Sequence, residues 1–298
     1  VPGYFELKIR NGESIVFSAS TKRDNPSALK RKKKKKKNRR LPRNSFISCL
    51  KNSAEQFIVQ NERGVEIIAG FPWFGTWGRD TFISLPGLML TTGNIEIARK
   101  VIRTMVKRLK DGLFPNTGGD SGNPAYNSVD APLWFIWSLQ ELGKYAGINI
   151  WKDYSKAIKN ILDCFRKGTL FNIKMQENGL IFSGQEGKAL TWMDALTEDG
   201  AVTPRTGMAV EINALWYNAL VQSLAWAEEA GDTQFLSRWS EWPDKIKSAF
   251  LEVFWSEEDG YLADYINGSE RNMDVRPNMM IAVSLDHVML TREMRNSV

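Results

Sequence analysis

Helical segments of two kinds alternate along the sequence, and this alternation restricts the fold more than any other feature. Residues 131–146 and 209–230 contain runs that are apolar nearly all round, and helices of that kind are buried. Residues 94–110 and 152–168 carry Lys and Arg on one face, so these helices should lie outside. An inner helix followed by an outer helix, repeated along the chain, predicts a toroid of helical hairpins.

Capping residues and apolar spacing predict eight helices. The first follows the capping residues Asn44 and Ser45 and runs to about Gln60. The other seven are predicted at about 80–92, 94–110, 131–146, 152–168, 209–230, 232–254 and 277–286. A closed barrel of six helical hairpins, an (α/α)6 barrel, requires twelve helices. The expected fold class is therefore all-α, an incomplete (α/α)6 toroid.

Residues 1–20 have the pattern of a β-hairpin. Tyr4–Ile9 alternates between apolar and polar side chains, Asn11-Gly12 is typical of a tight turn, and Ile15–Phe17 has the composition of a strand. A single hairpin is not stable alone in water, so we expect it to be the remnant of a β domain on its N-terminal side. The absence of an initiating Met fits a fragment. The expected divisions are 1–20 for the end of the β domain, 21–43 for a basic linker and 44–298 for the partial toroid.

One short segment gives the chain its basic character. Residues 30–40 hold ten positive charges, whereas the net charge of the whole chain is +6, so the remainder carries −4. A nucleic-acid-binding face usually scatters basic residues among aromatic ones. A single block of like charges is more typical of a solvated linker, with a nucleic-acid or anionic-surface patch as the alternative. We therefore expect no nucleic-acid partner.

Composition excludes several other classes of protein. No uninterrupted apolar run reaches the roughly 18 residues of a transmembrane helix, and no signal peptide opens the chain, so no membrane partner is expected. Two cysteines, Cys49 and Cys164, are too few for a disulfide scaffold and favour a reducing compartment, the cytoplasm. The single histidine, His287, excludes multi-histidine metal sites and leaves little room for a Ser-His-Asp triad. No metal and no cofactor are expected.

Four polar clusters share a position relative to the helices. They are Trp77-Gly78-Arg79-Asp80, Asn127-Ser128-Val129-Asp130, Thr191-Trp192-Met193-Asp194, and Glu211 after Pro204-Arg205-Thr206-Gly207. If the inner helices are parallel, three of the clusters meet at one pole, where helix N-termini offer free N–H groups and partial positive charge. Asp80 or Asp130 alone is explained equally well as a helix cap. Together with Arg79 and the tryptophans, these acids favour a functional site.

The chemistry that suits such a pole is glycoside hydrolysis, which needs two carboxyl groups and neither metal nor histidine. One carboxyl group protonates the leaving oxygen, and the other activates water or attacks directly. Eleven tryptophans are many for 298 residues, and indoles also stack on the apolar faces of sugar rings. Trp192 would favour the protonated form of Asp194 if the backbone turn brings the two together.

Several motifs occur in order between about residues 44 and 285. They are Gly70-Phe71-Pro72-Trp73-Phe74-Gly75-Thr76-Trp77-Gly78-Arg79-Asp80-Thr81-Phe82-Ile83, Gly112–Asn116, Tyr126–Ala131, Thr191–Asp194, Thr203–Ile212 and Arg276-Pro277-Asn278. This series resembles the amylo-α-1,6-glucosidase domain of glycogen debranching enzymes. The resemblance implies an (α/α)6 barrel that hydrolyses single α-1,6-linked glucosyl stubs of glycogen or a branched α-glucan with inversion.

The resemblance also implies roles for individual residues. Asp194 corresponds to the general acid. Arg79 and Asp80 look like the pair that binds hydroxyls of the terminal glucose, a task for which a guanidinium and a carboxylate are suited. The remaining candidates for the pocket walls are Trp77, Asp130, Trp192, Arg205 and Glu211.

One departure from the family pattern concerns the general base. The family places it in a later segment resembling Glu-Thr-Gln-Ala-Trp-Ser, which this sequence lacks. We therefore expect about a third of the barrel to be absent and the chain alone to be inactive. Glu211 as a substitute base is the weaker alternative, because the family has this glutamate beside its separate base. The competing functions are a non-catalytic carbohydrate-binding module and another exo-acting (α/α)6 α-glucosidase.

Overall fold

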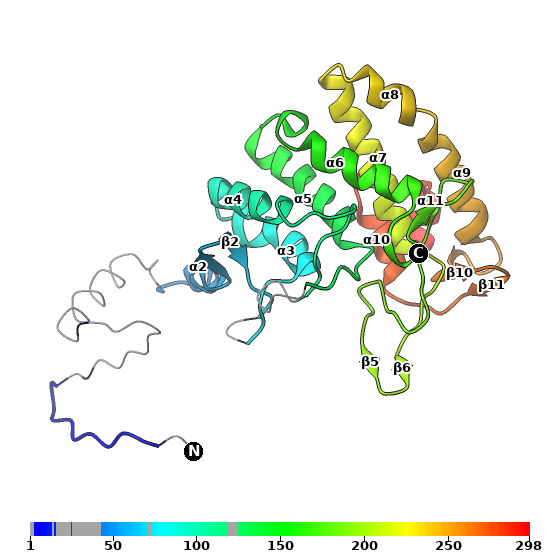
Figure 1. Cartoon of the computed structure of the whole chain (residues 1–298). Coiled ribbons are helices and arrows are strands. Elements are labelled where there is room, and N and C mark those ends of the chain that lie inside the picture. The colour runs from blue at the N-terminus through cyan, green and yellow to red at the C-terminus, as the bar shows by residue number, and fades with distance from the viewer. Residues whose placement is uncertain (1–2, 14, 16–24, 26–42, 71–72, 118–123) are drawn as a thin grey trace. The chain divides into compact units, whose positions relative to one another are not determined.

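The computed structural model of the chain describes residues 3–13, 15, 25, 43–70, 73–117 and 124–298 (Figure 1). The chain divides into two compact units, residues 1–53 and 54–298, and the second contains all the candidate site residues. Each unit is described by itself.

The N-terminal segment does not form the predicted first strand. Residues 3–13 contain the turn at Asn11-Gly12, but Tyr4–Ile9 is in no strand. Alternating side chains do not make a strand without a partner that supplies hydrogen bonds. The second half of the predicted hairpin, apart from Ile15, and the basic run at 30–40 lie outside the described residues.

Helix α2 (Phe46–Gln56) begins where its capping residues predict. The backbone N–H of Ser48 donates to the Ser45 hydroxyl at 3.2 Å, which satisfies a free donor of the first turn. The helix ends at Gln56 rather than at Gln60, because the chain continues into strand β1 (Ile58–Asn61). Strand β1 pairs antiparallel with β2 (Gly64–Ile67).

The other predicted helices are all present, with two differences. The segment predicted at 80–92 is α3 (Gly78–Leu85) followed by a π-helical stretch, Pro86–Leu90. The segment predicted at 232–254 is two helices, because a new helix starts at Trp242-Pro243, where proline fits the first turn. The remaining helices are α4 (Ile95–Val106), α5 (Ala131–Ala146), α6 (Ile150–Lys167), α7 (Val210–Glu229), α8 (Thr233–Trp239), α9 (Trp242–Phe254), α10 (Asn278–Ser284) and α11 (Arg292–Ser297).

The chain is rich in helix, as predicted, and its connections also contain short antiparallel strands that were not predicted. These are β3 (Lys174–Met175) with β4 (Ile181–Phe182), β5 (Leu196–Thr197) with β6 (Gly200–Ala201), β8 (Trp255–Ser256) with β9 (Tyr261–Leu262), and the sheet of β7 (Met208–Ala209), β10 (Tyr265–Asn267) and β11 (Glu270–Asn272). Two or three residues of alternating pattern are too short to be recognised against the helical background.

The predicted alternation of inner and outer helices is confirmed in the second unit (Figure 1). Helix α5 packs against α3 and α7, and α7 packs against α10, which gives an inner row. Helix α6 lies outside α5 and α7, with Ile158 and Phe165 buried and Lys152 and Lys156 exposed. Closure of the rows into a toroid stays a prediction. Within the described residues, no helix has both the length and the apolar character needed to cross a membrane.

Candidate active site

The guanidinium of Arg79 joins the starts of two inner helices. Arg79 lies in the first turn of α3, and its Nε donates to Oδ2 of Asp130, the N-cap of α5, at 2.6 Å. Its Nη2 donates to the Ser128 hydroxyl at 3.3 Å. The partial positive charge of a helix N-terminus and the guanidinium both stabilise the Asp130 carboxylate. The predicted meeting of helix starts at one pole is confirmed for α3 and α5.

The loop at residues 190–194 reaches the same guanidinium. The Thr191 carbonyl accepts a hydrogen bond from Nη2 of Arg79 at 3.0 Å, and Oδ2 of Asp194 accepts one from Nη1 at 2.8 Å. Nδ2 of Asn116 donates to the same Asp194 oxygen at 3.4 Å. These contacts fix the loop that carries the predicted general acid to the start of α3.

Arg79 is a buried cation whose charge is held by its neighbours. Burial alone would lower its pKa, but the carboxylates of Asp130 and Asp194 outweigh that effect and raise the pKa above the ordinary value. Its donors make four hydrogen bonds to protein acceptors. The geometry therefore supports a positioning role for Arg79 at least as directly as the predicted contact with a sugar hydroxyl.

A cavity of about 400 Å³ opens beside this cluster. Its lining contains five of the predicted site residues, together with two more from the segment before α3: Ala69, Phe74, Trp77, Arg79, Asp80, Trp192 and Asp194. The volume lies within the usual range for small-ligand sites, about 300–1,000 Å³. Carboxyl and guanidinium groups suit hydroxyl groups, and indoles suit the apolar faces of a sugar ring.

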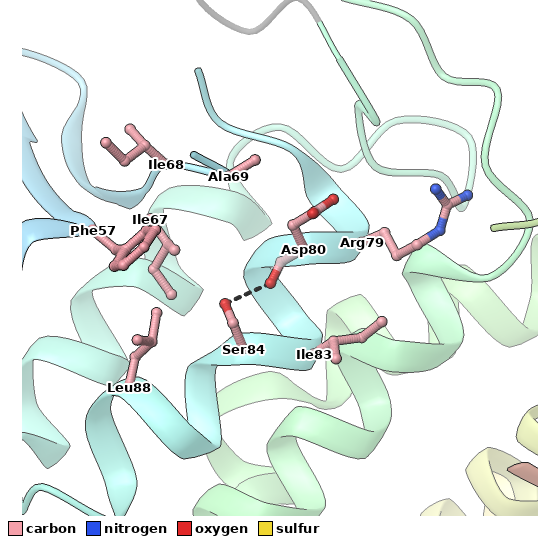
Figure 2. A pocket seen from close by; sticks show the side chains of 9 residues that line it. All are labelled: Phe57, Ile67, Ile68, Ala69, Arg79, Asp80, Ile83, Ser84 and Leu88. Carbon is pink, nitrogen blue, oxygen red and sulfur yellow. Dashed lines mark hydrogen bonds between the residues drawn. The ribbon is translucent and has the colours of Figure 1, made fainter. Parts of the chain in front are cut away.

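Asp80 borders both this cavity and a second one. The second cavity, of about 300 Å³, is lined mainly by aliphatic side chains such as Ile67, Ile83 and Leu88. Figure 2 shows the side chains of Arg79 and Asp80 leaving α3 in different directions. Burial raises the pKa of Asp80, and the charge of Arg79 offsets this only in part. Asp80 makes no ion pair with another described residue, so its carboxyl group is available to a ligand.

Two glycines permit close approaches around the cavity. A Cβ atom on Gly78 would lie 2.6 Å from the carbonyl oxygen of Pro115, so the start of α3 can lie directly against the segment that ends in Asn116. A Cβ atom on Gly70 would lie 2.6 Å from Cδ2 of Phe74. The Phe74 ring, which lines the cavity, thus packs on bare backbone.

Two predicted pocket residues, Arg205 and Glu211, belong to a separate buried cluster. Arg205 donates to both carboxylate oxygens of Glu211, with Nη2 at 2.7 Å from Oε2. Its Nε and Nη2 each donate to Asp264 at 2.9 Å. The three side chains are 1% exposed. Burial raises the pKa of Glu211, and Arg205 opposes that shift.

Three predicted site residues therefore lie outside the cavity lining in this structure. Arg205 and Glu211 do not line the cavity, and Asp130 is 1% exposed and faces Arg79. A carboxylate in the first turn of an inner helix has the same sequence pattern whether it faces a ligand or a buried arginine.

Sequence reasoning missed four residues that hold the site together, namely Asn116, Ser128, Asp264 and Asn278. Asn116, Ser128 and Asn278 occur within motifs that the resemblance singled out, so a signal for them existed. Asp264 lies in no such motif, yet it joins the starts of two helices, because its carbonyl accepts from the Val210 N–H and its carboxylate from Asn278.

Comparison with known proteins identifies the family. A family model described as amylo-alpha-1,6-glucosidase matches residues 52–298. The chain belongs to the amylo-α-1,6-glucosidase family. Every residue that lines the 400 Å³ cavity falls inside the matched region. The family membership makes this region a glycoside hydrolase domain of the debranching type.

The matches to individual relatives extend over part of this chain. The glycogen debranching enzyme of Saccharomyces cerevisiae is 30% identical over 236 residues, and the match covers 59% of this chain and 15% of that protein. The chain thus spans about 15% of the length of that relative.

Two solved structures of rhamnosidases are also similar to the family member described here. The α-L-rhamnosidase from Dictyoglumus thermophilum has a TM-score of 0.49 and 15% identity, covering 73% of this chain and 23% of that one. The GH78 family rhamnosidase of Bacillus sp. GL1 has a TM-score of 0.47 and 17% identity. This match covers 64% of the present chain and 18% of the rhamnosidase chain.

Proposed function

We propose that the chain acts in the hydrolysis of α-1,6-linked glucosyl branches of glycogen or a related α-glucan, releasing glucose with inversion. The observation that carries the proposal is the cavity of the matched domain, in which two carboxyl groups, Asp80 and Asp194, meet the indoles of Trp77 and Trp192 around Arg79. Glycoside hydrolysis needs such carboxyl groups and requires no cofactor.

Asp194 is the proposed general acid. In this structure Oδ2 of Asp194 accepts a hydrogen bond from Nη1 of Arg79 at 2.8 Å. Catalytic contacts adjust when substrate binds, so this hydrogen bond can loosen as the leaving oxygen approaches. With 29% of its side chain exposed, Asp194 has room for that adjustment.

Asp80 is proposed to bind glucose hydroxyls rather than to transfer the proton. Its carboxyl group lines the cavity without an ion pair to a described residue, so its oxygens can accept hydroxyl hydrogens. Glu211 is not proposed as the base, because Arg205 occupies both of its oxygens and the side chain is buried.

The proposal is tested with two substrates on the protein at its full natural length, because the 298-residue chain alone is expected to be inactive. We expect glucose release from a dextrin that carries single α-1,6-linked glucosyl stubs and little release from a linear maltodextrin of equal length. Proton NMR during the reaction should show β-glucose first, because inversion at an α-linkage gives the β-anomer. Equal rates on both substrates would instead indicate a general exo-α-glucosidase. Binding of the dextrin without release would indicate a carbohydrate-binding module.

As the pH falls, sugar binding should weaken at a higher pH than it would if Asp80 had the ordinary pKa of an aspartate. Because burial raises the pKa of Asp80, the hydroxyl-binding carboxylate is lost at a pH above its usual value of about 3.9. Calorimetric titration with the iminosugar 1-deoxynojirimycin across the acidic range checks this. The variant Asp80→Asn should bind more weakly and lack this dependence. An unchanged pH profile in Asp80→Asn would contradict the assignment.

A further inference from the structure

Trp192 is tied to a buried polar relay behind the cavity. Its indole Nε1 donates to Oδ1 of Asn278 at 2.6 Å, and Nδ2 of Asn278 donates to Oδ1 of Asp264 at 2.6 Å. Asn278 and Asp264 are buried, whereas Trp192 is 40% exposed and lines the cavity. The relay therefore runs from an accessible aromatic ring to an enclosed carboxylate.

Donor and acceptor chemistry permits only one orientation of this relay. An indole N–H can only donate, and an ionised carboxylate can only accept. Asn278 must therefore turn its oxygen to Trp192 and its NH₂ to Asp264. The reversed amide would face donor with donor and acceptor with acceptor, and both contacts would be lost.

Asp264 is a rigid end point for the relay. Its Oδ2 accepts from Nε of Arg205 at 2.9 Å and from Nη1 of Arg276 at 2.5 Å, while Nη2 of Arg205 shares Oδ1 with Asn278. Its backbone carbonyl accepts from the Val210 N–H at 3.0 Å, at the start of α7. Four donors fill the lone pairs of the carboxylate, so it has little freedom to turn.

The relay holds the indole of Trp192 by its N–H group, while the residue stays 40% exposed. The ring would otherwise rotate about two side-chain bonds, and fixing it beforehand removes an entropic cost when a ligand stacks on it. The same loop is held on the other side by Thr191 and Asp194, which both bond to Arg79. The Trp192 side chain is thus held by a residue of α10, and the loop that carries it is held by a residue of α3.

We infer that Asn278 and Asp264 are positioning residues that fix the Trp192 indole as a stacking platform for the sugar ring of the substrate. The inference rests on the proposed function for its ligand, and on the geometry alone for the fixing of the ring. None of the residues of the motif Arg276-Pro277-Asn278 lines the cavity. The inferred role of Asn278 in this motif is to position the Trp192 ring.

The first test needs no ligand. In a protein with ¹⁵N-labelled tryptophan, the variant Trp192→Phe assigns the indole N–H signal of Trp192. In Asn278→Ala that N–H should exchange with solvent faster, and its signal should shift, while the other indole signals stay in place. An unchanged Trp192 signal and exchange rate would overturn the fixing of the ring.

A double variant guards against simple misfolding. Asn278→Asp alone places its new carboxylate next to that of Asp264. Asp264→Asn alone removes the negative charge that Arg205 and Arg276 share. Combined, Asn278→Asp and Asp264→Asn keep the net charge and restore a relay of reversed polarity, since the carboxylate introduced on α10 accepts from both neighbours. The Trp192 signal should recover its slow exchange in the double variant. Exchange in the double variant as fast as in Asn278→Ala would contradict the relay.

The second test asks whether the fixed Trp192 ring contributes to sugar binding, and it measures the affinity for 1-deoxynojirimycin. Loss of one such hydrogen bond should weaken binding about three- to tenfold in Asn278→Ala. In a Trp192→Phe background the same change should alter affinity by less than about twofold, because the two act as one unit. Additive losses would overturn action through Trp192. If the unaltered protein bound no iminosugar, the proposed function and the ligand part would fail together, while the NMR comparison would still decide the fixing of the ring.

Discussion

Replacing Asp194 with asparagine is expected to slow glucose release from an α-1,6-branched dextrin by about 10²- to 10⁴-fold, the usual contribution of proton transfer. The same variant should hydrolyse α-D-glucosyl fluoride almost as fast as the unaltered protein, because fluoride leaves without being protonated. Steady-state rates on the two substrates, measured in the intact protein, give the comparison.

Asp80→Asn is the matched control, since both carboxyl groups line the same cavity. A residue that binds glucose hydroxyls serves both substrates, so this variant should lose kcat/KM on the dextrin and on the fluoride alike. If Asp80→Asn spared the fluoride and Asp194→Asn did not, the two roles would have to be exchanged.

The second large effect concerns stability. Replacing Arg205 with methionine should lower the free energy of unfolding by about 3–5 kcal/mol, because it leaves the buried carboxylates of Glu211 and Asp264 without their shared partner. Urea denaturation at neutral pH, followed by circular dichroism, measures the change.

An exposed ion pair supplies the control for Arg205. Arg238 pairs with Asp163 at 3.0 Å on the outer helices, where both side chains are partly exposed. Arg238→Met should therefore cost less than about 1 kcal/mol. Equal losses in the two variants would show that the buried cluster is not a major support of the fold.

Sequence predicted the helices well because their signals are local. Residues 131–146 were predicted with the bounds that α5 has, since an apolar run, an early proline and Gly147 in the left-handed region (φ +58°) mark both ends. The clusters at the helix starts were predicted to share one pole, but the hydrogen bonds from Arg79 to Asp130 and Asp194 were not predicted.

Predictions that depended on distant partners were less successful. The strand at Tyr4–Ile9 failed because alternation does not reveal whether a partner strand is present. Asp264 was missed because its partner Arg205 lies 59 residues away and no periodic pattern links them. Glu211 was placed in the pocket because composition cannot show which way a buried side chain faces.

The hydrogen bonds of Arg79 also bear on the order of events during folding. They join residues 51 and 115 positions apart, and the Trp192–Asn278 bond spans another 86. Contacts of such sequence separation form only after long loops close, and they come late compared with the helices themselves. On a ribosome, the Trp192–Asn278 hydrogen bond cannot form until α10 has emerged. A nascent chain that already has its earlier helices would still lack this bond, so the Trp192 ring would be fixed only after those helices have formed.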